Sequence, residues 1–281
     1  MEMRIITHKS MERYKAHLYG EERQKGTVEK YLRDVRKFAA FLDGREAGRE
    51  LAVQWRKQLL EQNYAPVTIN SMLAAVNGFF RFMGWQDCRV KFLRIQRKLF
   101  REQTRELTRQ EFDRLISTAR DLGRERLSLL METMAASGVR VSEVRSITVE
   151  AVRQGCVQIS LKGKIRTILL PEKLCRKLEK YAKKQKITAG EIFVTRSGKS
   201  MTRGQIWSEM KAVCKKAGVD ERKVFPHNLR HLFAVCVYRA CHDVAKLADL
   251  LGHSSLETTR IYLATSWTDH RRWLDRVTVL T

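Results

Sequence analysis

The most restrictive feature of the sequence is the stretch from Leu250 to Leu263, in which two helical patterns meet at one glycine. The first pattern is apolar at helical spacing and stops at Gly252, a residue type that commonly ends helices because it adopts a left-handed backbone without strain. Ser254 and Glu257 then have the spacing of a capping box, which predicts a second, short helix. The chain is therefore expected to turn sharply between two helices here.

Polar residues of distinct chemistry occupy this junction and the start of a helix upstream. His253 follows the glycine directly, and Tyr262 comes nine residues later, near the end of the second helix. Pro226 marks the beginning of the upstream helix, so His227 and Arg230 lie three residues apart on one face of its first turn. The pattern predicts that an imidazole and a tyrosine hydroxyl converge across one turn of chain.

The order and spacing of these residues resemble the motifs of the tyrosine recombinase family of phage integrases and Xer-type resolvases. The matching pieces are His-x-x-Arg-His at residues 227–231, Leu-Gly-His-Ser-Ser at residues 251–255, and a tyrosine nine residues after His253. Residues 137–144 are similar to the first arginine motif of the family, with Arg140 as its arginine. The resemblance spans roughly residues 8–265, with the specific motifs confined to the second part.

This resemblance implies a DNA strand transferase that forms a 3′-phosphotyrosyl intermediate and uses no cofactor and no metal. It assigns Tyr262 as the nucleophile, and Arg140 and Arg230 as the residues that hold the phosphate oxygens. Two guanidiniums can bind these oxygens bidentately, which makes Mg²⁺ unnecessary. His227 and His253 are expected to donate hydrogen bonds to the phosphate or to help move the tyrosine proton. The partner is a double-stranded DNA recombination site.

A change of period over residues 155–171 predicts a β-hairpin with lysines at its tip. The family carries a catalytic lysine in such a hairpin, usually within Gly-Lys-Gly. Here Leu161 stands in place of the first glycine, and the turn looks shorter. Lys162, which keeps the Lys-Gly pair, is the preferred general acid, and Lys164 is the alternative.

The fold is expected to be mainly α-helical, with this small β-hairpin in the second of two domains. Residues 1–87 read as a helical core-binding domain that clamps DNA. Residues 88–106 form a basic linker, for which a continuing amphipathic helix is the alternative. Residues 107–281 correspond to an α+β catalytic domain with a C-terminal docking helix.

Local signals mark several helix ends along the chain. In the first domain, Thr27 is expected to cap the second helix and Pro66 to begin the fourth. Thr108 and Glu111 form a capping box that opens the second domain, and Gly138 ends a helix two residues before Arg140. These signals place Arg140 between two helices, where a structural arginine paired with a nearby glutamate is the alternative interpretation.

The charge balance favours a polyanionic partner. Fifty-five Lys and Arg residues against 31 Asp and Glu give a net charge of +24, and both domains carry the excess. A protein that neutralises phosphates releases counterions, so nucleic acid is the expected partner. The residues expected to contact DNA are Lys30, Arg33, Lys37, Arg94, Arg97, Lys98 and Arg203, although solvated basic faces are the alternative interpretation.

No apolar run approaches the roughly 20 residues of a membrane-spanning helix, and the N-terminus has no signal-peptide core, so a cytoplasmic location is expected. The six cysteines show no zinc-binding spacing. The tail is too apolar for a free end, and in the family such a C-terminal helix docks on a neighbouring protomer. A cyclic tetramer on DNA is therefore expected, with packing within one chain as the alternative. The apolar tail residues are Trp267, Trp273, Leu274, Val277 and Leu280.

Two rival functions remain at this level. A type IB topoisomerase shares the chemistry but relaxes DNA as a monomer, and strand exchange between two duplexes would separate the two. A DNA-binding regulator without catalysis would form no covalent adduct. Within the recombinase interpretation, integration or excision of a mobile element and resolution of chromosome or plasmid dimers both remain open.

Overall fold

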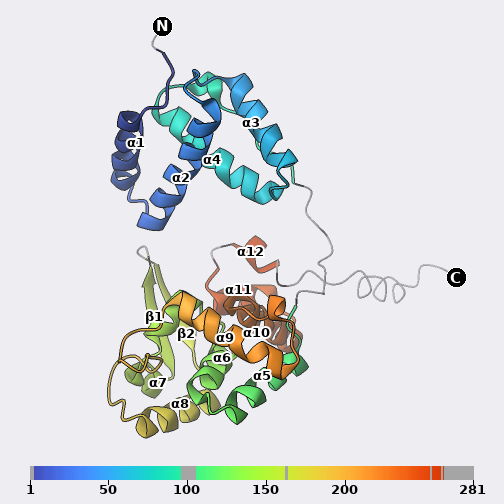
Figure 1. Cartoon of the computed structure of the whole chain (residues 1–281). Coiled ribbons are helices and arrows are strands. Elements are labelled where there is room, and N and C mark those ends of the chain that lie inside the picture. The colour runs from blue at the N-terminus through green and yellow to red at the C-terminus, as the bar shows by residue number, and fades with distance from the viewer. Residues whose placement is uncertain (1–2, 96–105, 162–163, 254, 261, 263–281) are drawn as a thin grey trace, which may run out of the picture. The chain divides into compact units, whose positions relative to one another are not determined.

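The computed structural model describes residues 3–95, 106–161, 164–253, 255–260 and 262 (Figure 1). The chain divides into two compact units, Met1–Arg97 and Lys98–Thr281. This division falls inside residues 88–106, the stretch that the sequence assigns to a linker.

The first unit is a bundle of four helices around an aromatic core. In this bundle α2 packs against α1, α3 and α4. Phe38, Phe79 and Phe80 are fully buried at its centre, and the Phe38 ring lies 5.1 Å from that of Trp55. The elements are α1 (His8–Gly20), α2 (Lys25–Leu42), α3 (Arg49–Glu61), α4 (Pro66–Phe82) and the 3₁₀ helix η1 (Gln86–Cys88).

The start of α2 differs from the prediction. The helix begins at Lys25 rather than after Thr27, and Gln24 precedes it without a side-chain cap. The backbone N–H of Thr27 already bonds to the Gln24 carbonyl, so Thr27 lies inside the first turn. The predicted start of α4 at Pro66 is confirmed, since the proline occupies the first helical turn, where a backbone N–H is not needed.

Two asparagines of α4 hold the chain that follows it. The side-chain amide of Asn77 donates to the carbonyl oxygen of Val90 at 2.9 Å and accepts from its N–H at 3.1 Å. Asn70 makes the same pair of bonds with Leu93, at 2.9 and 2.8 Å. The beginning of the predicted linker therefore lies against the first unit, up to Leu93.

The second unit is mainly helical and contains a two-stranded antiparallel sheet, which confirms the predicted fold class. In the sheet, Cys156 pairs with Leu169 and Leu161 with Lys164, so residues 162–163 connect the strands. The elements are α5 (Arg109–Asp121), α6 (Glu125–Ser137), η3 (Val141–Ser146), α7 (Val149–Gln154), β1 (Cys156–Leu161), β2 (Lys164–Leu169), α8 (Glu172–Lys184), α9 (Arg203–Ala217), η4 (Glu221–Lys223), α10 (Pro226–Cys241), α11 (Val244–Leu251) and α12 (Leu256–Arg260).

Several predicted helix ends of this unit are confirmed. Thr108 and Glu111 form both bonds of a capping box before α5. Gly138 and Gly252 end α6 and α11 in the left-handed conformation, with φ of 63° and 59°. The predicted capping box before α12 includes Ser254, which lies outside the described residues.

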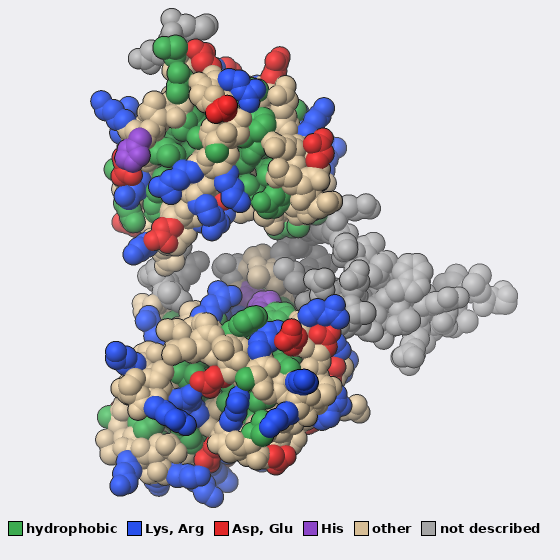
Figure 2. Space-filling view, viewed as in Figure 1, with side chains coloured by type: hydrophobic (Ala, Val, Ile, Leu, Met, Phe, Trp, Pro, Cys, Tyr) green, Lys and Arg blue, Asp and Glu red, His purple; other side chains and the backbone are tan. Residues whose placement is uncertain are grey.

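Lys and Arg side chains are spread over the visible face of each unit, with fewer Asp and Glu among them (Figure 2). Among the residues that the structure describes, no helix is long and apolar enough to cross a membrane. Within the same residues, no group of three or more His, Cys, Asp and Glu side chains is arranged to hold a metal ion.

Candidate active site

Arg230 lies at the point where the ends of three helices meet. It belongs to the first turns of α10 and is only 3% exposed. Its guanidinium donates to the carbonyl oxygen of Gly138, at the end of α6, and to that of Leu251, at the end of α11, the latter at 2.7 Å. Carbonyl groups at helix C-termini carry partial negative charge and attract a cation. The fold therefore fixes this arginine rigidly, and burial followed by the nearby charge of Arg140 lowers its pKa.

His253 contacts Arg230 through one ring nitrogen. Its Nε2 lies 3.0 Å from Nη2 of Arg230, and its Nδ1 lies 2.9 Å from the hydroxyl of Thr259. A guanidinium can only donate, so Nε2 accepts, and the proton of the neutral ring sits on Nδ1. Burial, together with the charges of Arg230 and other arginines, lowers the pKa of His253 to about 4. The ring is therefore neutral at neutral pH.

Arg140 reaches the same region from the segment between α6 and η3. Its backbone N–H donates to one carboxylate oxygen of Glu143 at 2.8 Å, and its Nη1 to the other at 2.9 Å. Glu143 is buried, with 2% of its side chain exposed, whereas 40% of the Arg140 side chain is exposed. The pairing proposed as a structural alternative thus exists, and it leaves part of the guanidinium open to solvent.

A third arginine binds the same carboxylate. Nη1 of Arg166, on β2, lies 3.1 Å from both oxygens of Glu143. Burial alone would raise the pKa of the Glu143 carboxyl, but the hydrogen bonds from Arg140 and the two arginine charges outweigh it and lower the pKa. Burial lowers the pKa of Arg166 to about 10, which still leaves it charged at neutral pH.

Tyr262 is 6% exposed and sits among imidazole rings. Its ring centroid lies 5.5 Å from that of His231, 5.7 Å from that of His253 and 5.8 Å from that of His227. A hydrogen bond to Tyr262 is among the interactions that support the charged form of Arg230. The structure therefore brings the tyrosine beside His253, as the spacing predicts, and also to the buried Arg230.

The predicted catalytic lysines and DNA-contacting residues lie outside this cluster or outside the described residues. Lys162 lies outside the described residues, and Lys164 is the first residue of β2. Lys30 and Arg33 both lie close to the buried carboxylate of Asp34. Among the remaining predicted DNA contacts, the exposed side chains are Lys37, Arg94 and Arg203, while Arg97 and Lys98 lie outside the described residues.

Sequence reasoning missed Arg166, although a signal was present. Alternation along β2 places Arg166 on the same face as Ile168, which is 1% exposed, so a charged residue occupies an inward position of the strand. His231 was quoted in the motif without a role. It is 3% exposed, and its Nε2 lies 3.3 Å from a carboxylate oxygen of Glu106.

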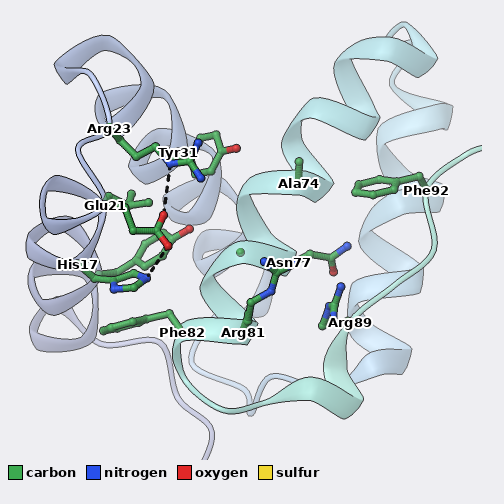
Figure 3. Close-up of a pocket in the computed structure, with 13 residues that line it drawn as sticks. His17, Glu21, Arg23, Tyr31, Ala74, Asn77, Arg81, Phe82, Arg89 and Phe92 are labelled. Atoms are coloured by element: carbon green, nitrogen blue, oxygen red, sulfur yellow. Dashed lines mark hydrogen bonds and ion pairs between the residues drawn. The ribbon is translucent and has the colours of Figure 1, made fainter. Parts of the chain in front are cut away.

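A separate cavity of about 550 Å³ lies in the first unit, between α1, α2, α4 and the chain after η1 (Figure 3). Arg23, Arg81 and Arg89 line it, and Glu21 is its acidic member. Glu21 interacts with both Arg23 and His17, as the dashed lines in Figure 3 mark. This hollow is therefore basic overall and is built independently of the arginine cluster in the second unit.

Comparison with known proteins gives the class of this chain. The sequence model described as the phage integrase family matches residues 105–268, and the one described as the phage integrase N-terminal SAM-like domain matches residues 11–87. The tyrosine recombinase XerD of Xanthomonas campestris pv. campestris is 29% identical, with 92% of this chain and 88% of the relative covered. XerD of Pseudomonas putida is 31% identical, with 77% of each chain covered.

A solved structure shares the fold. The Tn1549 transposon integrase in complex with transposon right end DNA superimposes with a TM-score of 0.73 at 17% identity, covering 96% of this chain and 99% of that chain. The chain therefore belongs to the phage integrase family of tyrosine recombinases. It is an enzyme of site-specific recombination, which cleaves and rejoins DNA strands.

Proposed function

We propose that this recombinase cleaves DNA with Tyr262 as the nucleophile and forms a 3′-phosphotyrosyl intermediate. The observation that carries the proposal is the cluster around Arg230. Its buried guanidinium contacts His253 and shares a hydrogen bond with Tyr262. A phenol beside a fixed cation and the neutral imidazole of His253 has the groups that attack on a phosphodiester requires.

Arg140 and Arg230 bind the non-bridging oxygens of the scissile phosphate in this proposal. Negative charge grows on these oxygens when an oxygen nucleophile attacks, and cations that are already positioned stabilise it without rearrangement. The exposed part of Arg140 is available to a phosphate, and the bonds of Arg230 to Gly138 and Leu251 keep it in place. The step needs no metal ion and no other cofactor.

The bonds and protons of the step balance within the protein and the DNA. The Tyr262 oxygen bonds to phosphorus, and the bond from phosphorus to the 5′ oxygen breaks. The 5′ oxygen takes a proton from a lysine, for which we propose Lys162, with Lys164 as the alternative. Attack by a 5′ hydroxyl on the phosphotyrosine reverses the step and rejoins a strand, so no ATP is consumed.

The histidines assist the attack by Tyr262. Nε2 of His253 already accepts a hydrogen bond from Arg230, and its protonation would place two cations 3.0 Å apart, so we propose that His253 orients Arg230 and that the tyrosine proton passes to the ring of His227. The ring of His227 lies 5.8 Å from that of Tyr262 and is exposed, so we propose that it also contacts the phosphate.

DNA binding is proposed to involve both domains and the linker between them. Residues 1–87 clamp the duplex, residues 88–106 follow its phosphates, and residues 107–281 carry the catalytic site. Basic residues of all three parts contact phosphates, and the set is that expected from the sequence: Lys30, Arg33, Lys37, Arg94, Arg97, Lys98 and Arg203.

We propose that the apolar C-terminal tail docks on the second unit of a neighbouring protomer in a tetramer on DNA. A groove of about 240 Å³ on that unit includes Phe112, Ala135, Leu174 and Leu232 among its lining residues. Apolar side chains of the tail, such as Trp273, match such a lining. The mass of the complex on DNA carrying two sites tests this assembly, and a monomer at saturating protein would contradict it.

The biological role is proposed as integration or excision of a mobile element, or as resolution of chromosome or plasmid dimers. Both roles use the same chemistry, and the DNA sequence recovered in the test below would distinguish them. Strand exchange between two duplexes is expected, whereas relaxation of supercoils by a monomer would indicate a topoisomerase.

The test is covalent trapping. Wild-type protein, without metal or ATP, is incubated with nicked duplexes pooled from DNA that flanks its own gene, and adducts that resist SDS are counted. Tyr262→Phe should form none, because the attacking oxygen is missing. Tyr181→Phe is the matched control, since this tyrosine lies in α8, away from the cluster, and its adduct should equal that of wild type. Binding without an adduct on pools containing the authentic site would favour a regulator.

A further inference from the structure

Arg166 is a charged residue on the inward face of β2 that the proposed mechanism does not use. Its side chain is 12% exposed. Besides both oxygens of Glu143, it approaches the carbonyl oxygen of Leu250 with Nη2, at 3.4 Å. One side chain thus connects the strand that follows the predicted lysine turn to η3 and to the end of α11.

The carboxylate of Glu143 is shared between two guanidiniums. Its single negative charge faces the positive charges of Arg140 and Arg166, so the trio keeps one net positive charge. If Arg166 were neutral, Arg140 and Glu143 would form a neutral pair. A phosphate arriving at Arg140 would then meet an attraction largely cancelled by the carboxylate. Arg166 is therefore needed for Arg140 to present net charge to DNA.

Arg166 also lies directly against the turn that carries His253. A Cβ atom added to Gly252 would lie 2.3 Å from Cδ and 2.5 Å from Nε of Arg166. The backbone before His253 therefore packs on the arginine stem with no space between them. The charge of Arg166 is also one of those that keep His253 neutral.

We propose that Arg166 is a positioning residue for strand cleavage. The positive charge of Arg166 balances the negative charge of Glu143, so the charge of Arg140 is left to attract the scissile phosphate. The stem of Arg166 also supports the turn that places His253. The inference rests on the proposed function and goes beyond it, because Arg166 acts through Arg140 and His253 rather than on the phosphate itself.

Arg166→Met tests the proposal, since methionine keeps much of the stem and removes the charge. The measurement is the first-order rate of adduct formation at saturating protein, on a nicked duplex that wild type cleaves. We expect a fall on the order of 10²-fold, comparable to the loss of one oxyanion donor. The Kd for DNA should change by less than about threefold, because binding is spread over many phosphates.

A second substitution separates charge from packing. Glu143→Gln, added to Arg166→Met, removes the carboxylate that would otherwise neutralise Arg140. The double variant should cleave about tenfold faster than Arg166→Met alone, since the net charge at Arg140 is restored. A purely structural role predicts the reverse, because a second buried change would add to the damage. Arg166→Lys, which keeps the charge, should cleave faster than Arg166→Met.

Arg126→Met is the matched control. Arg126 is also a partly buried arginine of the second unit, and it bonds to a carbonyl oxygen, that of Val194, and to a carboxylate, that of Glu209, each at 2.6 Å. Its loss should lower the thermal unfolding midpoint but leave the cleavage rate of the saturated complex unchanged.

The outcomes separate the two proposals. A wild-type protein that forms no adduct on its authentic site overturns the proposed function and this inference with it. A normal wild-type adduct, combined with Arg166→Met that cleaves as fast as Arg126→Met, overturns the inference alone. If Arg166→Met shows no cooperative unfolding, it is not folded, and the cleavage rates of Arg166→Lys and of the double variant are compared instead. A double variant that cleaves no faster than background contradicts the role of charge.

Discussion

Arg230 and His253 share a hydrogen bond, and this bond fixes the form of the histidine. The neutral ring accepts from the guanidinium, and a protonated ring would place two cations 3.0 Å apart. Protonation therefore costs free energy in the folded protein that it does not cost in the unfolded chain, and this explains why burial and the arginines lower the pKa of His253 to about 4.

The first prediction concerns stability against pH. The pKa of a histidine in the unfolded chain is about 6.5. Between pH 6.5 and about 4, the unfolded state therefore binds a proton at His253 that the folded state does not. The contribution of His253 is therefore fully present above the unfolded pKa and is lost as pH falls toward about 4. Thermal unfolding of the second unit from pH 7.5 to 4.5 should show this decline, and His253→Gln should reduce it.

Glu143 titrates in a different window. Its folded pKa lies below its ordinary value of 4.5, so its contribution is present above that value and is lost only at more acidic pH. The decline between pH 6.5 and 4.5 is thus assigned to His253 rather than to this carboxylate. An unchanged slope in His253→Gln would contradict the assignment.

The second prediction separates two basic residues of α2. Nζ of Lys30 lies 3.0 Å from buried Asp34 and donates to the Ser71 carbonyl oxygen at 2.6 Å, whereas the Arg33 side chain is 64% exposed. A phosphate can engage Arg33 at the expense of only a longer contact, 3.5 Å from its Nε to Asp34. Arg33→Ala should therefore lower the slope of log Kd against log salt by about 0.9, the value for one phosphate contact.

Lys30→Ala should change that slope less and should destabilise the first unit, because it leaves the buried carboxylate of Asp34 without its lysine partner. Binding titrations over a range of NaCl, together with thermal unfolding, measure both effects. Equal changes of slope in the two variants would show that Lys30 leaves Asp34 to bind DNA.

At the scale of elements, the glycines that end helices differ in what surrounds them. Gly252 and Gly218 have nearly the same backbone, with φ of 59° and 61°. A Cβ at Gly218 would meet nothing within 4 Å, whereas at Gly252 it would collide with Arg166. One position therefore needs glycine for its backbone alone, and the other needs it for backbone and space.

The third prediction compares alanine at these two positions. Gly218→Ala should cost about 1 kcal/mol of stability from left-handed strain and leave the cleavage rate of the saturated complex unchanged. Gly252→Ala should carry the same strain and also slow cleavage, because Arg166 must move away from Glu143 or Leu250. Thermal unfolding and adduct formation measure the two effects. Equal cleavage rates in both variants would show that Arg166 accommodates the added methyl group.

The ends of helices could be predicted from the sequence wherever the signal is local. The capping box of Thr108 and Glu111 and the glycine at 252 act within a few residues, and the structure confirms both. The start of α2 was placed wrongly at Thr27, because that helix begins without any side-chain cap and so leaves no sequence signal.

The contacts that could not be predicted from the sequence are those between residues far apart in the chain. Arg166 bonds to a residue 23 positions away and to another 84 positions away, so its role depends on how strands and helices pack. The two hydrogen bonds between the Asn77 amide and the backbone of Val90 are also long-range. The sequence predicted a linker here, whose backbone would make no such bonds. The approach of Tyr262 to His253, by contrast, was expected from motif spacing, and the family resemblance implied that Arg230 joins them.

At the scale of the whole molecule, positive charge is widespread while the proposed chemistry is concentrated. The net charge of +24 draws on both units. The cluster, in contrast, depends on a few side chains, of which Arg230 is 3% and Glu143 also 3% exposed. Salt screens exposed charges over about 8–10 Å at physiological ionic strength, but it screens buried pairs much less. Binding and cleavage should therefore respond differently to salt.

The fourth prediction follows from this contrast. If six to ten phosphates are contacted, raising NaCl from about 50 to about 200 mM should weaken DNA affinity by about 10³–10⁵-fold. The first-order rate of adduct formation, measured with enough protein to saturate the DNA at each salt concentration, should change by less than about threefold, because Arg230 is buried and the bound phosphate would itself cover the exposed part of Arg140. Arg230→Ala should have the converse effect, abolishing cleavage while most binding remains. A cleavage rate in the saturated complex that falls in parallel with affinity would mean that the charges acting on the scissile phosphate are solvent-exposed ones, and not those of the buried cluster.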